Sequence, residues 1–222
     1  MSATLPVIDE LRRLLYTPVL SDVLDSFGLM RQALRPFVRP IDDSLVLFGR
    51  VRTGRYALSG ATRPGANPYQ LEMELIDSLQ PGEVAILACN GPTEVTAPWG
   101  ELLSTAARAR GAAGCVTDGL VRDIARIRAM GFPVFHGGIG PLDTKGRAEM
   151  VEKDTVVEIA GVRAAPGDWV MGDIDGVVIV PAGQAEQVFR AALDKIAAED
   201  TTRAELEAGA SLQEVFARHG VL

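Results

Sequence analysis

The residues best suited to chemistry lie in one stretch, residues 100–123. It begins within the sequence WGELL, in which Gly100 precedes an expected helix. Free backbone N–H groups and the positive end of the helix dipole suit a small carboxylate or phosphate at such a position, and glycine lets a ligand approach the backbone closely. The pattern is also typical of an ordinary helix start with an acidic first turn, so both interpretations stay open.

A second group of polar residues follows in TDGLVRD, residues 117–123. An apolar strand ends at Asp118 and the next helix begins near Asp123; ligand sites of open α/β sheets lie at such strand ends. Arg122 offers a planar fork for a carboxylate, and Asp123 offers a hard oxygen ligand for a divalent cation. The structural alternative has Asp123 as a helix N-cap and Arg122 as a surface residue.

The residue types available restrict the metals that the protein can bind. Its two histidines are His136 and His219, and its two cysteines, Cys89 and Cys115, each stand in an apolar run that predicts a buried, unreactive thiol. We therefore do not expect a zinc site. Carboxylates, carbonyls and water are the ligands that remain, which predicts Mg²⁺ or Mn²⁺. Lysines are few, which leaves little scope for a Schiff base.

Two further motifs invite a ligand and are better explained by turns. Asp173 and Asp175 have a D-x-D spacing, but Asp-Gly between two strands predicts a hairpin turn. The glycine-rich sequence GGIG, residues 137–140, lacks both the spacing of a dinucleotide fingerprint and the lysine of a P-loop, so we expect a tight turn.

Composition and charge exclude several classes of partner. The 222 residues carry a formal net charge of −7 with no basic cluster, so nucleic acid is not expected. No run of about 18 apolar residues occurs, so we expect no membrane span. Asp9 and Glu10 interrupt the start of the chain before any long apolar core, so we expect no signal peptide and a cytoplasmic location.

Strands and helices alternate through the middle of the chain, which is typical of α/β architecture. After Gly140 the pattern changes to strands alone, and two helices close the chain, one from Gly183 to about Ala198 and one over 211–218. We expect the polar segment between them to reach beyond the domain to a neighbour. The earlier elements are expected as helix 17–28, strand 45–58, helix 67–80, strand 83–89, helix 100–110, strand 113–117, helix 122–130 and strand 133–136.

The sequence GELLSTAARARGAAGCVTDGLVRDIARIRAMGFPVF resembles the RraA-like family, which includes the class II 4-hydroxy-4-methyl-2-oxoglutarate aldolases. TPVLSDVLDSFG is similar to the family's N-terminal helix, and APGDWVMGDIDGVVIVP to its C-terminal strand pair. The resemblance implies an α/β fold of the three-layer β/β/α swivelling-domain type, as a single domain over residues 1–222. It also implies homotrimers or homohexamers with sites between subunits, residues 199–222 packing on a neighbour.

The resemblance also implies roles for particular residues. The backbone at Leu102 and Leu103, together with Gly100 and Glu101, would bind the 2-oxo carboxylate of the substrate, and Arg122 would support it.

Metal binding and proton transfer would fall to acidic residues. Asp123 would anchor Mg²⁺ or Mn²⁺, partly through water. Glu101 stands where some family aldolases carry Asp near the metal, and would join Arg122 and Asp123 as a catalytic residue. Glu199 is similar to a family glutamate that reaches the neighbouring subunit's site.

The expected function is therefore a divalent-metal-dependent C–C lyase. It would cleave 4-hydroxy-2-oxo acids to pyruvate and would also decarboxylate oxaloacetate, because both reactions pass through the enolate of pyruvate. The alternative, from a different class, is a non-catalytic regulator that binds a ribonuclease, as some members of this family are.

Overall fold

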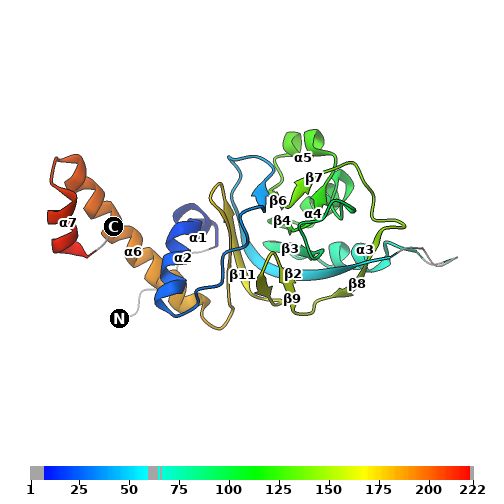
Figure 1. Cartoon of the computed structure of the whole chain (residues 1–222), viewed down its shortest axis with the longest axis horizontal. Helices are drawn as coiled ribbons and strands as arrows, with labels where there is room; N and C mark the ends of the chain where they lie inside the picture. The colour runs from blue at the N-terminus through cyan, green and yellow to red at the C-terminus, as the bar shows by residue number, and fades with distance from the viewer. Residues whose placement is uncertain (1–7, 60–64, 66, 221–222) are drawn as a thin grey trace.

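The computed structural model describes residues 8–59, 65 and 67–220. Its centre is a mixed sheet in the order β1-β6-β4-β3-β2-β11-β12, with β8 paired to the far half of β2 (Figure 1). The strands of this sheet are β1 (Arg39–Pro40), β2 (Leu47–Leu58), β3 (Glu83–Ala88), β4 (Gly114–Thr117), β6 (Val134–His136), β8 (Ala148–Lys153), β11 (Trp169–Asp173) and β12 (Gly176–Val180).

Parallel strands joined by helices form the half of the sheet that positions the site. β2, β3, β4 and β6 run parallel, and the chain between them forms α3 (Gln70–Asp77), α4 (Glu101–Ala109) and α5 (Ile124–Met130). These helices bury their apolar stripes against one face of the sheet, with Leu75, Ala107 and Ile127 each fully enclosed. The expected alternation of strands and helices is confirmed.

A second β layer covers the opposite face. The hairpin of β9 (Val157–Ile159) and β10 (Val162–Ala164) packs its valines and Ile159 on the central strands. Helices, main sheet and hairpin thus make the expected three-layer β/β/α architecture.

The N-terminal helices and the long C-terminal helix pack together beside β11 and β12. α1 (Ile8–Leu14), α2 (Thr17–Ser26) and the first half of α6 (Ala185–Glu207) share a cluster around Phe48. The ring of Phe48 stacks on Trp169 at 5.0 Å between centroids. Figure 1 shows α6 leading away from the sheet, with α7 (Leu212–His219) at its far end.

The expected end of this long helix near Ala198 was wrong. α6 is one helix, Ala185–Glu207, so the polar segment is helical. Its Ala, Glu, Leu and Arg residues favour helix, and Lys195 pairs with Glu199 one turn on, at 3.1 Å. α7 then folds back, where Arg218 pairs with Glu205 of α6 at 2.8 Å.

The structure confirms the hairpin turn expected at residues 173–176 and the burial expected for both cysteines. Asp173 ends β11 at a hairpin turn, and its carboxylate accepts hydrogen bonds from the Thr17 backbone N–H at 2.7 Å and hydroxyl at 2.6 Å. Cys89 and Cys115 are buried, and burial raises the pKa of both thiols. In the part of the chain described, no helix is long and apolar enough to cross a membrane.

Candidate active site

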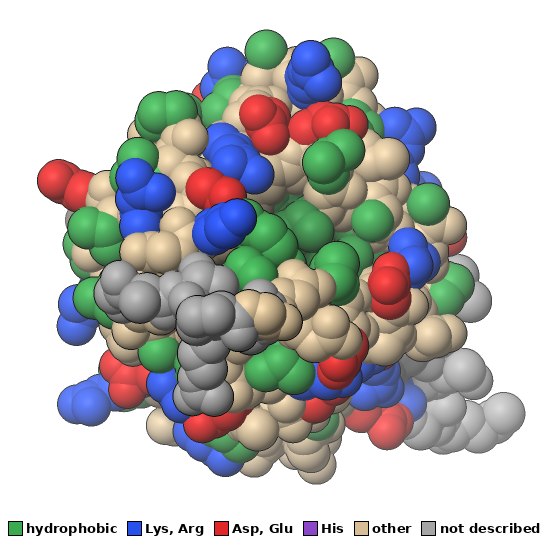
Figure 2. Space-filling model, turned by 90° about the vertical axis from the view of Figure 1, so that its right-hand side faces the viewer, with side chains coloured by type: hydrophobic (Ala, Val, Ile, Leu, Met, Phe, Trp, Pro, Cys, Tyr) green, Lys and Arg blue, Asp and Glu red, His purple; other side chains and the backbone are tan. Residues whose placement is uncertain are grey.

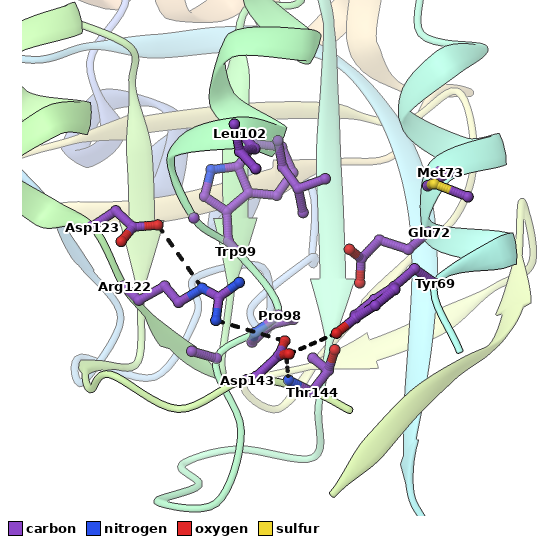
Figure 3. Close-up of a pocket in the computed structure, with 13 residues that line it drawn as sticks. Tyr69, Glu72, Met73, Pro98, Trp99, Leu102, Arg122, Asp123, Asp143 and Thr144 are labelled. Atoms are coloured by element: carbon purple, nitrogen blue, oxygen red, sulfur yellow. Dashed lines mark hydrogen bonds and ion pairs between the residues drawn. The ribbon is translucent and has the colours of Figure 1, made fainter. Parts of the chain in front are cut away.

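A cavity of about 400 Å³ opens beside the first turn of α4 (Figure 3). Figure 2 views the end of the molecule that carries α3 and β8, and shows apolar side chains in a hollow with charged side chains near its rim. The cavity combines the same two kinds of residue. Its lining is Tyr69, Glu72, Met73, Ala97, Pro98, Trp99, Gly100, Leu102, Leu103, Arg122, Asp123, Asp143 and Thr144.

Two short strands hold the chain at Arg122. β5 (Leu120–Val121) pairs in parallel with β7 (Gly138–Ile139), so the expected tight turn at 137–140 is partly a strand. Val121 also forms a bridge with Trp99, and the Arg122 N–H donates to the Trp99 carbonyl at 3.0 Å. Because of this pairing, the segment before α4 and the segment before α5 lie side by side.

Gly100 lies in close contact with two side chains, which the sequence did not reveal. A Cβ on Gly100 would lie 2.8 Å from the Asp123 Oδ2 and 3.2 Å from the Arg122 Cγ. The glycine therefore leaves room for the side chains of Asp123 and Arg122.

Asp123 occupies the N-cap position of α5 without acting as a cap. Its side chain makes no capping hydrogen bond, and its backbone is left-handed, with φ of 62°. Such a conformation costs a non-glycine residue about 1 kcal/mol or more and is often found at functional sites. The carboxylate instead accepts a hydrogen bond from the Glu101 backbone N–H at 3.2 Å, at the start of α4.

Arg122 lies between two carboxylates in the cavity wall. Its Nη1 is 3.7 Å from Asp143 Oδ1, and its Nε is 3.9 Å from Asp123 Oδ2 (Figure 3). Both separations are longer than a hydrogen bond, so the guanidinium can still donate to a third anion. Arg122 is thus a cavity residue rather than a plain surface residue.

The first turn of α4 offers further hydrogen-bond donors beside Arg122. N–H groups of a first helical turn have no acceptor within the helix. That of Glu101 is taken by Asp123, and those of Leu102 and Leu103 have no hydrogen-bond acceptor among the described residues. Both leucines line the cavity.

Asp143 and Tyr69 belong to the site and were not found from the sequence. The Tyr69 hydroxyl donates to Asp143 Oδ2 at 2.6 Å, and the Thr144 N–H donates to Oδ1 at 2.8 Å. Burial alone would raise the pKa of Asp143, but these bonds and Arg122 outweigh it, so this pKa is lowered. Burial and the bond to Asp143 raise the pKa of Tyr69 to about 12.

Glu72 is a third residue that the sequence analysis missed. Its side chain is buried, with the whole residue 7% exposed, and the Tyr56 hydroxyl donates to its Oε2 at 2.5 Å. Burial raises the pKa of Glu72 to about 7. The helical spacing of the sequence indicates that Glu72 is buried, because Glu72 lies on the same face of α3 as Leu75 and Ile76.

Two predicted acidic residues lie outside this cavity. The Glu101 side chain accepts from the Thr105 hydroxyl at 2.9 Å and lies 4.0 Å from Arg126. Glu199 is in α6, where the Tyr16 hydroxyl donates to it, while the cavity is beside α3 and α4 at the other end of the molecule (Figure 1). Within one chain, Glu199 and Arg122 are not brought together.

The donors beside Arg122 suit a largely hydrated divalent cation. Asp123 offers an accessible carboxylate, 44% exposed. Over the described ranges there is no cluster of three His, Cys, Asp or Glu side chains able to enclose a metal. Mg²⁺ typically keeps several waters and uses one or two carboxylates plus the substrate, so this chain fits such an ion and not a closed metal centre.

Fold and cavity together define a three-layer β/β/α protein with a cavity, lined by Arg122 and Asp123, at parallel strand ends. The chain belongs to the RraA-like family, whose model, described as Aldolase/RraA, matches residues 17–179.

Similar sequences include proteins with an aldolase name and a protein whose name states no activity. A Halalkalibacterium halodurans protein named as a candidate 4-hydroxy-4-methyl-2-oxoglutarate aldolase is 31% identical over 82% of this chain and 80% of its own length. Protein DlpA of Legionella pneumophila is 26% identical over 88% of this chain, which spans only 31% of DlpA.

One similar solved structure is described as a member of a ribonuclease-inhibitor family. Streptomyces coelicolor RraAS2, described as an unusual member of the RNase ES inhibitor RraA protein family, superposes with a TM-score of 0.76. It is 26% identical and covers 87% of this chain and 96% of its own. The family therefore contains names from both an enzyme class and a regulator class.

Proposed function

We propose that this protein is a divalent-metal-dependent lyase that releases pyruvate from 4-hydroxy-2-oxo acids of the 4-hydroxy-4-methyl-2-oxoglutarate type and from oxaloacetate. The observation that carries the proposal is that Arg122, Asp123 and the first turn of α4 line one cavity of about 400 Å³. That volume suits a small dicarboxylic acid. Aldolase names among the relatives support the same class.

The cavity residues divide the work of binding and orientation. The N–H groups of Leu102 and Leu103 and the guanidinium of Arg122 bind the substrate carboxylate. Asp143 keeps Arg122 in place from the other side. Asp123, fixed by the N–H of Glu101, would hold Mg²⁺ or Mn²⁺.

Both reactions break the C3–C4 bond and leave the enolate of pyruvate. In the retro-aldol reaction the C4 hydroxyl loses its proton, the C3–C4 bond breaks, and its electron pair passes to the C2 oxygen. In oxaloacetate the bond to the C4 carboxylate breaks and carbon dioxide leaves. Mg²⁺ or Mn²⁺, when bound, supplies Lewis-acid stabilisation of the charge on the 2-oxo group. None of the described residues that line the cavity is a lysine, so the chemistry proceeds without a Schiff base.

A coupled assay tests the proposal. Lactate dehydrogenase reports pyruvate from oxaloacetate and from 4-hydroxy-4-methyl-2-oxoglutarate, with Mg²⁺, Mn²⁺ or EDTA. We expect release with either metal and loss with EDTA. No metal-dependent pyruvate from either substrate would refute the lyase.

We further propose that the protein assembles as a homotrimer or homohexamer in which residues 199–222 pack on a neighbour. Support comes from the way α6 and α7 lead away from the sheet (Figure 1), and from the exposure of Leu212 and Phe216, 53% and 48%. Glu199 would then reach the neighbour's cavity. Mixing Glu199→Ala with Arg122→Ala subunits should restore activity that each lacks alone, because some sites would be complete; no restoration would place Glu199 outside the site.

The RraAS2 likeness favours one second function, binding to a ribonuclease. A pull-down with a ribonuclease scaffold region, run beside the pyruvate assay, separates the two. Binding without pyruvate release would favour the regulator.

A further inference from the structure

The carboxyl group of Glu72 lines the cavity, and only one of its two oxygens accepts a hydrogen bond from a described residue. Figure 3 shows it on α3, directed into the cavity from the side opposite Arg122 and Asp123. Its Oε2 accepts from the Tyr56 hydroxyl at 2.5 Å. Among the described residues, no protein donor bonds to Oε1. That oxygen is therefore left for a ligand.

The surroundings of Glu72 keep both its acid and its carboxylate available near neutral pH. Burial is the largest effect and raises the pKa of Glu72 to about 7, while Tyr56 and Arg122 oppose the rise and Asp143 adds to it. Such a pKa is the one that a general acid–base needs. The titratable and charged groups around it are Tyr56 of β2, Tyr69 before α3, Cys89 after β3, Arg122 after β5 and Asp143 after β7.

The other cavity groups are unsuited to proton transfer. The pKa of Asp143 is lowered, and both its oxygens accept hydrogen bonds from the protein. The hydroxyl proton of Tyr69 is held by Asp143, and the Tyr69 pKa is about 12. Glu101 lies outside the cavity, and its side chain is directed to Thr105.

We propose that Glu72 is the catalytic acid and base that moves the proton at C3 of the substrate, an inference that rests on the proposed lyase function. In the retro-aldol reaction its carboxylate takes the C4 hydroxyl proton and then gives it to C3 of the enolate, restoring the C2 carbonyl. In oxaloacetate decarboxylation its acid form protonates C3, and the carboxylate regains a proton from water. That reaction consumes one proton overall, and the balance closes.

Hydrogen–deuterium exchange at the methyl group of pyruvate isolates this step from C–C cleavage. Proton NMR in D₂O with Mg²⁺ follows wild type, Glu72→Gln and Glu72→Asp. Glu74→Gln is the control, since Glu74 lies on the same helix, is exposed, and pairs with Lys153 at 3.6 Å. We expect exchange to fall about 100-fold or more in Glu72→Gln, with partial recovery in Glu72→Asp and no change in Glu74→Gln. Calorimetry should show that Glu72→Gln still binds pyruvate.

Tyr56→Phe separates a catalytic role from a structural one, even if Glu72→Gln folds poorly. Wild-type exchange should rise with pH as Glu72 becomes a carboxylate. Because the Tyr56 hydrogen bond lowers the pKa of Glu72, its loss should move that rise to higher pH. A structural role would change the rate without moving the profile.

These measurements distinguish failure of the Glu72 proposal from failure of the lyase proposal. Wild-type-like exchange in Glu72→Gln, or an unmoved profile in Tyr56→Phe, would overturn the role of Glu72 while pyruvate release from oxaloacetate still supports the lyase. If wild type neither exchanges nor releases pyruvate, both proposals fall.

Discussion

The Asp123 carboxylate accepts a hydrogen bond from the backbone N–H of Glu101, at 3.2 Å and across 22 positions of sequence. This bond joins the loop before α5 to the first turn of α4, so that the start of one helix fixes a carboxylate that precedes the next. The contact depends on Gly100, over which Asp123 and Arg122 lie.

Gly100→Ala should therefore disable the site. The added Cβ would lie 2.8 Å from Asp123 Oδ2, and a displacement of functional groups by about 1 Å can reduce activity about 100-fold. Steady-state kinetics and thermal unfolding should show a loss of kcat/KM with the fold retained. Gly183→Ala, where nothing lies within 4 Å of the new Cβ, is the matched control. Equal activity of the two variants would contradict this packing.

Glu72→Gln should change how stability depends on pH. The pKa of Glu72 rises from 4.5 unfolded to about 7 folded, so its contribution to stability is present below pH 4.5 and is lost as pH rises through about 7, a change of about 3 kcal/mol. The free energy of unfolding in urea, measured at pH 5 and pH 8, should fall less in the variant than in wild type. An equal fall in the free energy of unfolding of both proteins would mean that folding does not raise the pKa of Glu72.

Asp143→Asn should weaken substrate binding more than the fold. Asp143 carries the charge that faces Arg122, at 3.7 Å, and without it Arg122 is less well oriented. We expect KM to rise roughly tenfold, equivalent to about 1.4 kcal/mol of binding energy. Asp42→Asn, in a surface turn closed by Ser44, should leave KM unchanged. A normal KM for Asp143→Asn would remove Asp143 from substrate binding.

Removal of the metal should abolish activity without unfolding the protein. The described part of the chain holds no three-residue metal cluster, so little folding energy depends on an ion. We expect EDTA to eliminate pyruvate release while Tm changes by less than about 2 °C. A large fall in Tm would reveal a structural metal.

Local patterns predicted the fold better than they predicted the site. The alternation from Glu83 to His136 is confirmed because short apolar strands and glycine stops are local signals. Arg122 was singled out because ligand sites of α/β sheets lie at strand ends, and it lines the cavity. The bond from Tyr69 to Asp143 spans 74 positions, and no local pattern announces it. The end of α6 was missed because residues 199–207 are polar, although their helix propensity is high.

The most direct test compares Arg122, which precedes α5, with Arg126 in its first turn. Arg122 lines the cavity, whereas Arg126 is directed outward, with its side chain 78% exposed. Pyruvate release from oxaloacetate with Mg²⁺ gives kcat/KM for Arg122→Ala and Arg126→Ala. We predict a loss of about 100-fold or more for Arg122→Ala, since a charged hydrogen bond in the transition state is removed, and a change of less than about threefold for Arg126→Ala. Equal activity of both variants and wild type would contradict the assignment of this cavity as the active site.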